Sequence, residues 1–209
     1  NSRIRIARPQ CTRQDLVKTS GDGDVVRGAL DALERNHQRG HAIALARLLA
    51  DAAPRDPGAV WRLARLLDDT GVAREETEGL LRRLLELVPD VAIVRVRLAW
   101  HVLAGAPAEA LALVEPMLDQ QSPDLFDAAS AALSALGRTS EASRTLDRAL
   151  QAAPNRAIGL ARLASRHSQA NRFARALDLV RLLDLDAVAR DPALDDDDRE
   201  FVEDAWLTA

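Results

Sequence analysis

Apolar residues recur at three- and four-residue steps along most of the 209-residue chain. Leu63 and Leu67 follow Val60 in this way, and Leu177 follows Phe173. This spacing places apolar side chains on one face of a helix. Ala, Leu and Arg dominate the composition, aromatic residues make up only 3%, and Tyr is absent. Both observations favour helix over strand, so an all-α fold is predicted.

Prolines close Leu- and Ala-rich stretches at intervals of 35, 34 and 31 residues, at Pro54, Pro89, Pro123 and Pro154. A Gly or Asn, the residues that most readily end a helix in the left-handed conformation, divides each interval. These breakers are Gly40, Gly71, Gly105, Gly137 and Asn171. Five helix pairs are therefore predicted, over residues 24–54, 55–89, 90–123, 124–154 and 155–188. One pair cannot bury its apolar stripe alone, so the pairs are expected to stack as an α-solenoid.

The fourth pair fits a known repeat pattern closely. Its first helix offers Phe126, Ala129, Ser130 and Leu133, Gly137 makes the turn, and its second helix offers Ala142, Leu146, Ala149 and then Pro154. This arrangement resembles the tetratricopeptide repeat family, as a degenerate array of the bacterial type. Ser130 and Ala142 are expected where the paired helices come closest, and Ala149 where the next repeat docks.

Other pairs depart from the pattern. Glu76 stands where the second repeat should have a small residue, and Arg95 replaces the large apolar residue that opens the third. The first repeat has Asn36 where an apolar residue is expected. The resemblance covers residues 24–188 and implies a right-handed superhelix whose first helices line a concave, peptide-binding groove.

The small residue of each repeat is used to decide which side of the first helix faces the groove. By this criterion two tryptophans lie on the groove face. The predicted groove residues are Trp61, Arg65, Val96, Trp100, Leu103, Asp127, Ala131 and Ser165. Trp is enriched among interface anchors, and small residues opposite leave room for a guest side chain. The alternative is that Trp61 and Trp100 replace missing core residues of their own repeats.

Arg62, Arg97 and Arg162 occupy matching places and are predicted to line the groove rim. They either bind acidic groups of a partner or pair with neighbouring acids such as Asp68 and Asp69. Some relatives bind carboxylates through lysine and asparagine, but Lys18 is the only lysine here.

The net charge of −4 gives no attraction to nucleic acid, and no stretch is long and apolar enough for membrane insertion. Residues 1–18 nevertheless carry +4 and residues 184–209 carry −8. The predicted organisation is a basic leader (1–20), a repeat array (21–188) and an acidic capping helix (189–209). In that last helix, predicted from Asp195 to Leu207, Phe201, Ala205 and Trp206 are expected to be buried, and the opening acids to favour the positive helix N-terminus.

Motifs for catalysis and cofactor binding are absent from the sequence. His37 and His41 have a metal-compatible spacing, but Gly40 is expected to break the helix between them. Cys11 is the only cysteine, which excludes an intrachain disulfide and leaves the compartment undecided between cytoplasm, which is favoured, and periplasm. No metal and no cofactor is predicted.

The sequence therefore predicts a non-catalytic module that binds a peptide or a segment of a partner protein. Two alternatives stay open. Because the chain starts at Asn1 with strand-like Arg3–Arg8, it is interpreted as a piece of a longer protein, where it would position substrate or partner for an enzyme lying upstream. Alternatively, the oppositely charged ends or a repeat edge make it self-associate as a homodimer.

Overall fold

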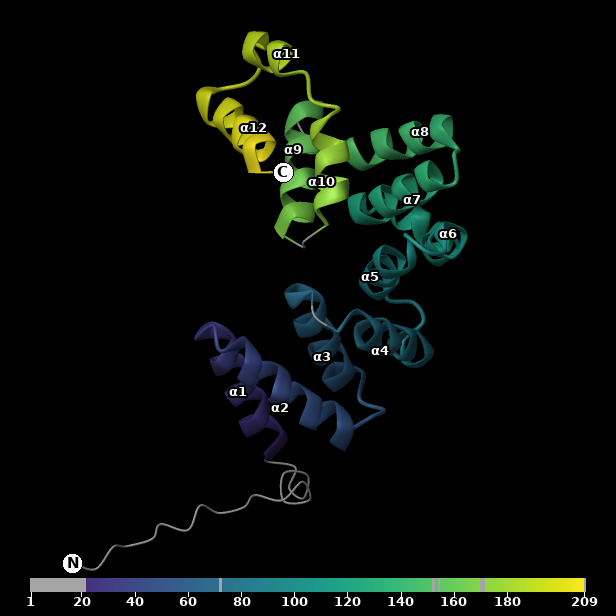
Figure 1. The fold of residues 1–209 in the computed structure, drawn as a ribbon, viewed down its shortest axis with the longest axis vertical. Helices are drawn as coiled ribbons and strands as arrows, with labels where there is room; N and C mark the ends of the chain where they lie inside the picture. The colour runs from purple at the N-terminus through teal and green to yellow at the C-terminus, as the bar shows by residue number, and fades with distance from the viewer. Residues whose placement is uncertain (1–21, 72, 152, 154, 170–171, 209) are drawn as a thin grey trace, which may run out of the picture. The chain divides into compact units, whose positions relative to one another are not determined.

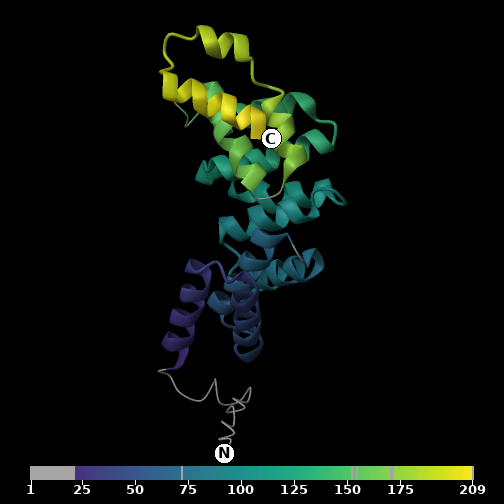
Figure 2. The same ribbon diagram turned by 60° about the vertical axis from the view of Figure 1, so that its left-hand side comes forward.

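The computed structural model describes residues 22–71, 73–151, 153, 155–169 and 172–208 (Figures 1 and 2). Over these residues the chain forms twelve α-helices and one 3-10 helix, and no strand. It divides into two compact units, residues 1–67 and 68–209. The predicted basic leader, residues 1–20, lies outside the described residues.

The first unit contains α1 (Asp22–Arg35), α2 (Arg39–Ala52) and most of α3 (Pro57–Thr70). The first two helices pack together and bury Leu30, Ala42 and Ala46 completely. Two ion pairs join α3 to α1, Arg62 to Asp31 at 2.6 Å and Arg65 to Glu34 at 2.5 Å.

The second unit begins with the last turn of α3, at Asp68. Its helices are α4 (Arg74–Leu87), α5 (Ala92–Val102), α6 (Pro107–Val114), the 3-10 helix η1 (Glu115–Gln120), α7 (Pro123–Ala135), α8 (Thr139–Leu150), α9 (Arg156–Gln169), α10 (Phe173–Val180), α11 (Leu185–Arg190) and α12 (Asp196–Thr208). Helices α5 and α6, α7 and α8, and α9 and α10 pack as pairs. The predicted segments 90–123 and 124–154 correspond to the pairs α5–α6 and α7–α8, while 155–188 contains α9, α10 and the start of α11; the division into five repeats stays a prediction. None of the described helices is long and apolar enough to cross a membrane.

A small buried residue recurs near the start of the second helix of each pair, α2, α4, α6, α8 and α10. It lies four residues after the N-cap, and its N–H donates to the N-cap carbonyl over 2.9–3.1 Å. The five residues are Ala42, Thr77, Ala110, Ala142 and Ala176, each at most 7% exposed. A larger side chain at this position would push the helix away from its neighbours.

Thr77, rather than Glu76, is the small residue of the second repeat, so the expected departure at Glu76 was wrong. Both Gly71 and Ala73 have left-handed backbone, with φ of 66° and 58°. Helix α4 starts at Arg74, so Thr77 lies six residues after Gly71, whereas Ala142 lies five residues after Gly137. Thr77 is fully buried, and its hydroxyl donates to the Ala73 carbonyl at 3.1 Å, which makes it compatible with a tight position.

The predicted break at Gly40 was also wrong. Helix α1 ends at Arg35, and His37 adopts the left-handed conformation with φ of 56°. Gly40 instead lies in the first turn of α2, which starts at Arg39. His37 is thus a turn residue and His41 a helical one. Asn171 lies outside the described residues, and Gly137 is left-handed as predicted, with φ of 74°.

The best-fitting repeat has the predicted close approach. The Ser130 hydroxyl on α7 donates to the Ala142 carbonyl on α8 at 2.9 Å, and both residues are buried. Ala149 packs in one apolar cluster with Leu160 and Leu163 of the following helix. The small residues therefore set both the spacing within this pair and the docking of the next one.

Arg95 stands where the repeat pattern has a large apolar residue at the start of the first helix. Its side chain makes polar contacts there instead of apolar ones. Its guanidinium donates to the carbonyls of Pro89 at 2.9 Å and Leu113 at 3.1 Å. The side chain thus satisfies backbone acceptors at the ends of two second-helix segments, where carbonyls lack helical partners.

The C-terminal helix α12 lies against α9 (Figures 1 and 2). Asp195 accepts a hydrogen bond from the N–H of Asp198 at 2.8 Å, which caps the start of the helix. Val202 and Ala205 are buried against Ile158 and Ala161, whereas Phe201 is 38% and Trp206 48% exposed. The prediction of burial was therefore right for Ala205 and wrong for Phe201 and Trp206. The face of α12 that packs against α9 contains Val202 and Ala205, three residues apart.

We expect Ala142→Trp to destabilise the protein by roughly 1 to 3 kcal/mol through overpacking beside Ser130. Urea unfolding followed by circular dichroism measures this loss. Ser143→Trp, on the exposed neighbouring position, is the matched control and should change stability by less than about 0.5 kcal/mol. Equal stability of the two variants would show that the helices do not approach closely at Ala142.

Candidate functional site

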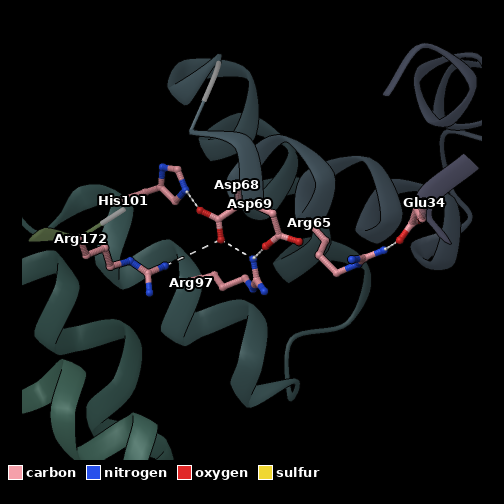
Figure 3. Close-up of polar contacts among 7 residues, drawn as sticks. All are labelled: Glu34, Arg65, Asp68, Asp69, Arg97, His101 and Arg172. Carbon is pink, nitrogen blue, oxygen red and sulfur yellow. Dashed lines mark hydrogen bonds and ion pairs between the residues drawn. The ribbon is translucent and has the colours of Figure 1, made fainter. Parts of the chain in front are cut away.

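Three side chains of the second unit converge on the carboxylate of Asp68 at the end of α3 (Figure 3). Arg97 of α5 donates to Oδ2, and His101 Nε2, one turn later, lies 2.9 Å from Oδ1. Arg172, at the N-cap of α10, is 3.8 Å from Oδ2. Arg97 also contacts Asp69 at 3.3 Å. The last turn of α3 is thus tied to two elements more than 25 residues further along the chain.

Asp68 is held as a carboxylate. Burial by itself would raise its pKa, but the hydrogen bond with His101 and the charges of Arg97 and Arg172 outweigh burial. The net pKa of Asp68 therefore lies below its usual value.

A second carboxylate, Asp127 of α7, has the same kind of surroundings and is only 2% exposed. His167 Nε2 of α9 is 2.5 Å from Oδ2, and Arg175 of α10 donates to Oδ1 at 2.6 Å. Burial acts to raise the pKa of Asp127, but the His167 hydrogen bond and the Arg175 charge lower it further than burial raises it. Asp127 thereby joins three helices inside one unit.

The acids determine the orientation of both histidines. Because an ionised carboxylate only accepts hydrogen bonds, Nε2 of His101 and of His167 must carry the proton. The opposite ring atoms, Nδ1 in both residues, are buried and have no hydrogen-bond partner among the described residues. Unpaired buried polar atoms are costly, so a non-polar packing of this face would be more stable.

Trp100 of α5 links the two carboxylate centres. Its ring meets that of His167 edge to face, with centroids 4.6 Å apart and an interplanar angle of 68°. The Arg172 guanidinium lies 5.3 Å from the Trp100 ring centroid. We call the set Asp68, Arg97, Trp100, His101, Asp127, His167, Arg172 and Arg175 the inner-face network. It connects α5 with α9 and α10, helices that are not neighbours in the chain.

The predicted groove residues divide between the two units. Trp61 and Arg65 lie half-buried on α3 in the first unit. In the second unit, Trp100 and Asp127 belong to the inner-face network, Val96 and Ala131 are buried, and Leu103 and Ser165 are half-buried. Their role in binding stays a prediction.

The predicted rim arginines have different surroundings. Arg62 pairs with Asp31, and Arg97 with Asp68 and Asp69, as the ion-pair interpretation of this row expects. Arg162 is exposed on α9.

Sequence reasoning missed His101, His167, Arg172 and Arg175 as members of one network. One signal was available for His167: it occupies the place that Leu133 fills in the fourth repeat, so a polar ring stands at an apolar position. Such a residue needs a buried partner. Its acid, Asp127, lies 40 residues away, where spacing alone gives no pairing.

The inner-face network combines arginine, tryptophan and histidine side chains around two carboxylates. Within the described residues, no group of three or more His, Cys, Asp and Glu side chains is placed to hold a metal ion.

No protein-family model matches the chain, and no curated protein sequence does. Several solved structures do. MamA from Desulfovibrio magneticus RS-1, from residue 41 to its end, matches 77% of this chain and 96% of its own at 15% identity, with a TM-score of 0.59. MamA of AMB-1 covers 83% and 93% at 21% identity and a TM-score of 0.56. PilW, a type IV pilus biogenesis factor, covers 91% and 89% at 18% identity and a TM-score of 0.57.

The fold is a tetratricopeptide-like α-solenoid. The helix pairs and the repeated small residue agree with this result, which confirms the resemblance read from the fourth repeat. At 15–21% identity these structures establish the fold and leave the function to be argued from the residues.

We expect Asp127→Asn to lower the free energy of unfolding by about 3 to 5 kcal/mol at pH 7, because Arg175 loses its buried counter-charge. A carboxyl with a lowered folded pKa stabilises the fold above its unfolded pKa, about 4, and loses this effect as pH falls through the folded pKa. Wild-type stability should therefore fall below about pH 4, and the variant should show a shallower fall.

Urea unfolding from pH 7 to pH 2 checks both statements. Asp178→Asn is the control, since Asp178 is exposed and only 3.7 Å from Arg181 in a surface pair. A variant with wild-type stability at pH 7 and an unchanged pH profile would contradict the assignment of Asp127 as a structural carboxylate.

Proposed function

We propose that this chain is a non-catalytic module that binds a peptide or a segment of a partner protein on the inner face of its first helices. The observation that carries this proposal is the half-buried Trp100, flanked by His167 and Arg172. Tryptophan and arginine together are the residues most enriched among energetically dominant interface contacts.

The polar character of this face supports the proposal. Ion pairs that replace apolar packing in a protein interior commonly cost stability. The fourth repeat shows that the same repeat position takes a leucine, Leu133, where this network has His167. Polar groups kept at the expense of stability are expected where another molecule is recognised, and an inner face built from first helices presents them together.

The protonation of the network argues against acid–base catalysis. Asp68 and Asp127 both have lowered pKa values and both accept from a histidine and an arginine. A general base works best with a pKa near the operating pH. These carboxylates are instead fixed charges that orient their neighbours. The same binding role would suit a domain that positions a partner for an enzyme elsewhere in a longer protein.

We expect Trp100→Ala to weaken peptide binding by about 2 kcal/mol, roughly thirtyfold in Kd, because it removes an aromatic anchor. Binding peptides would be selected on the wild-type chain from a displayed random library, and their Kd measured by calorimetry. Trp206→Ala, which removes an exposed tryptophan from α12, is the matched control and should bind normally.

Thermal unfolding of the same variants separates binding from core packing. Truncation of a core tryptophan costs roughly 3 to 5 kcal/mol of stability. If Trp100→Ala loses that much stability while the remaining folded protein binds peptide with wild-type affinity, Trp100 is a core residue and the proposal fails.

A further inference from the structure

A cavity of about 310 Å³ lies between the start of α9 and the short helix α11, within the second unit. Leu160 and Val188, both buried, contribute to its apolar wall. Leu182, which also lines the cavity, is 51% exposed, so the apolar lining reaches the molecular surface. This volume is at the lower end of the range of ligand sites and is enough for an aliphatic side chain. The cavity shares no residue with the inner-face network.

Two carboxylates, Asp184 and Asp191, also line this cavity. Asp184 accepts a hydrogen bond from the N–H of Ala187 at 3.0 Å. Asp191 accepts from the Asn155 amide at 2.8 Å and from the N–H of Ala193 at 2.9 Å. Neither acid forms an ion pair with another described residue. Because an ionised carboxylate offers about four acceptor positions, both can receive a cation from outside.

The charge around the cavity is negative. Arg156, a cation that lines it, pairs with Asp147 and so does not neutralise the two lining acids. The surrounding segment, residues 184–209, carries a net charge of −8. Aliphatic walls beside such a field favour an occupant with aliphatic and cationic side chains and disfavour an anion.

The basic leader of the chain has this composition. Residues 1–18 carry +4, and residues 3–8 read Arg, Ile, Arg, Ile, Ala, Arg. In an extended segment with this alternation, the isoleucines Ile4 and Ile6 lie on one side. Arginine side chains are long enough to reach acids beside the cavity while an isoleucine enters it.

We propose that residues 3–8 of one copy of this chain dock in the α9–α11 cavity of a second copy, with an isoleucine in the cavity and arginines on Asp184 and Asp191. The leader precedes the first helix and the cavity belongs to the last helices, so the contact joins the start of one copy to the end of another. Such a head-to-tail contact differs from a symmetric dimer interface and can repeat from copy to copy. It goes beyond the proposed function, because it uses a different surface from the inner face.

Photo-crosslinking of the full chain tests the contact itself. Cys11 is the only cysteine and lies five residues after Ile6, so a photoreactive maleimide labels the leader alone. The labelled chain is mixed with unmodified chain that carries ¹⁵N throughout. Mass spectrometry should find crosslinks from Cys11 to residues 182–191 of the ¹⁵N chain.

Sedimentation equilibrium then measures how strongly the copies associate. Asp184→Asn should weaken association at least several-fold, because it removes one receiving charge, and Asn still caps α11. Asp186→Asn is the matched control, since Asp186 is 89% exposed on the same helix and does not line the cavity. Association should also weaken between about 20 and about 500 mM salt, because salt screens the exposed charges.

A second pair of variants tests the apolar part of the contact. The double replacement Ile4→Ser and Ile6→Ser should weaken association by about tenfold or more, as expected when a buried aliphatic side chain is lost. Val17→Ser, which changes a β-branched residue of the leader outside residues 3–8, should leave it unchanged. Circular dichroism melting checks that every variant folds.

Three results would overturn this inference. They are a chain that stays monomeric at every concentration, crosslinks from Cys11 that avoid residues 182–191 of the ¹⁵N chain, and association that is equally strong in Asp184→Asn and Asp186→Asn. None of them bears on the proposed function, which peptide binding by the Trp100→Ala variant tests separately.

Discussion

The close approach of helices at one small residue is the constraint on which the rest of this structure depends. Ala42, Thr77, Ala110, Ala142 and Ala176 recur four residues after the N-cap of each second helix. Because the side chain at that position is small, the two helices of a pair can pack closely after a short turn. Larger residues would separate the helices, and every later contact would shift. The repeats vary in length and composition elsewhere, but the residue at this position is never larger than threonine.

Once the pairs are fixed, the first helices of the second unit, together with Arg172 and Arg175 of α10, carry a polar inner-face network instead of an apolar seam. Asp68 and Asp127 each accept from a histidine and an arginine, and Trp100 lies between the two centres. This arrangement keeps both acids charged and places the Arg172 guanidinium 3.8 Å from Asp68. Under the proposed function, stability and recognition compete at the same residues.

Local spacing explains what the sequence could predict. The helix pairs, the Ser130–Ala142 contact and the docking of Ala149 follow from residues less than about one repeat apart. The shift to Thr77 could not be predicted, because Ala73 adopts a left-handed conformation that favours glycine. Pairings such as Asp127 with His167 and Arg175 span 40 and 48 residues, and 28 basic and 32 acidic residues offer too many alternatives. Exposed Trp206 was misassigned because the buried face of α12 follows Val202 and Ala205, and a shift of one residue turns a helix by about 100°.

We propose that partners bind on the inner face of the first helices. Site-specific photo-crosslinking tests it directly. A photoreactive amino acid at Ser134, which is exposed and two turns after Asp127 on α7, should crosslink to an enriched peptide. The same group at Ser143, exposed on α8, should not. Crosslinking at Ser143 but not at Ser134 would contradict the account, because it would place the bound peptide on the second helices.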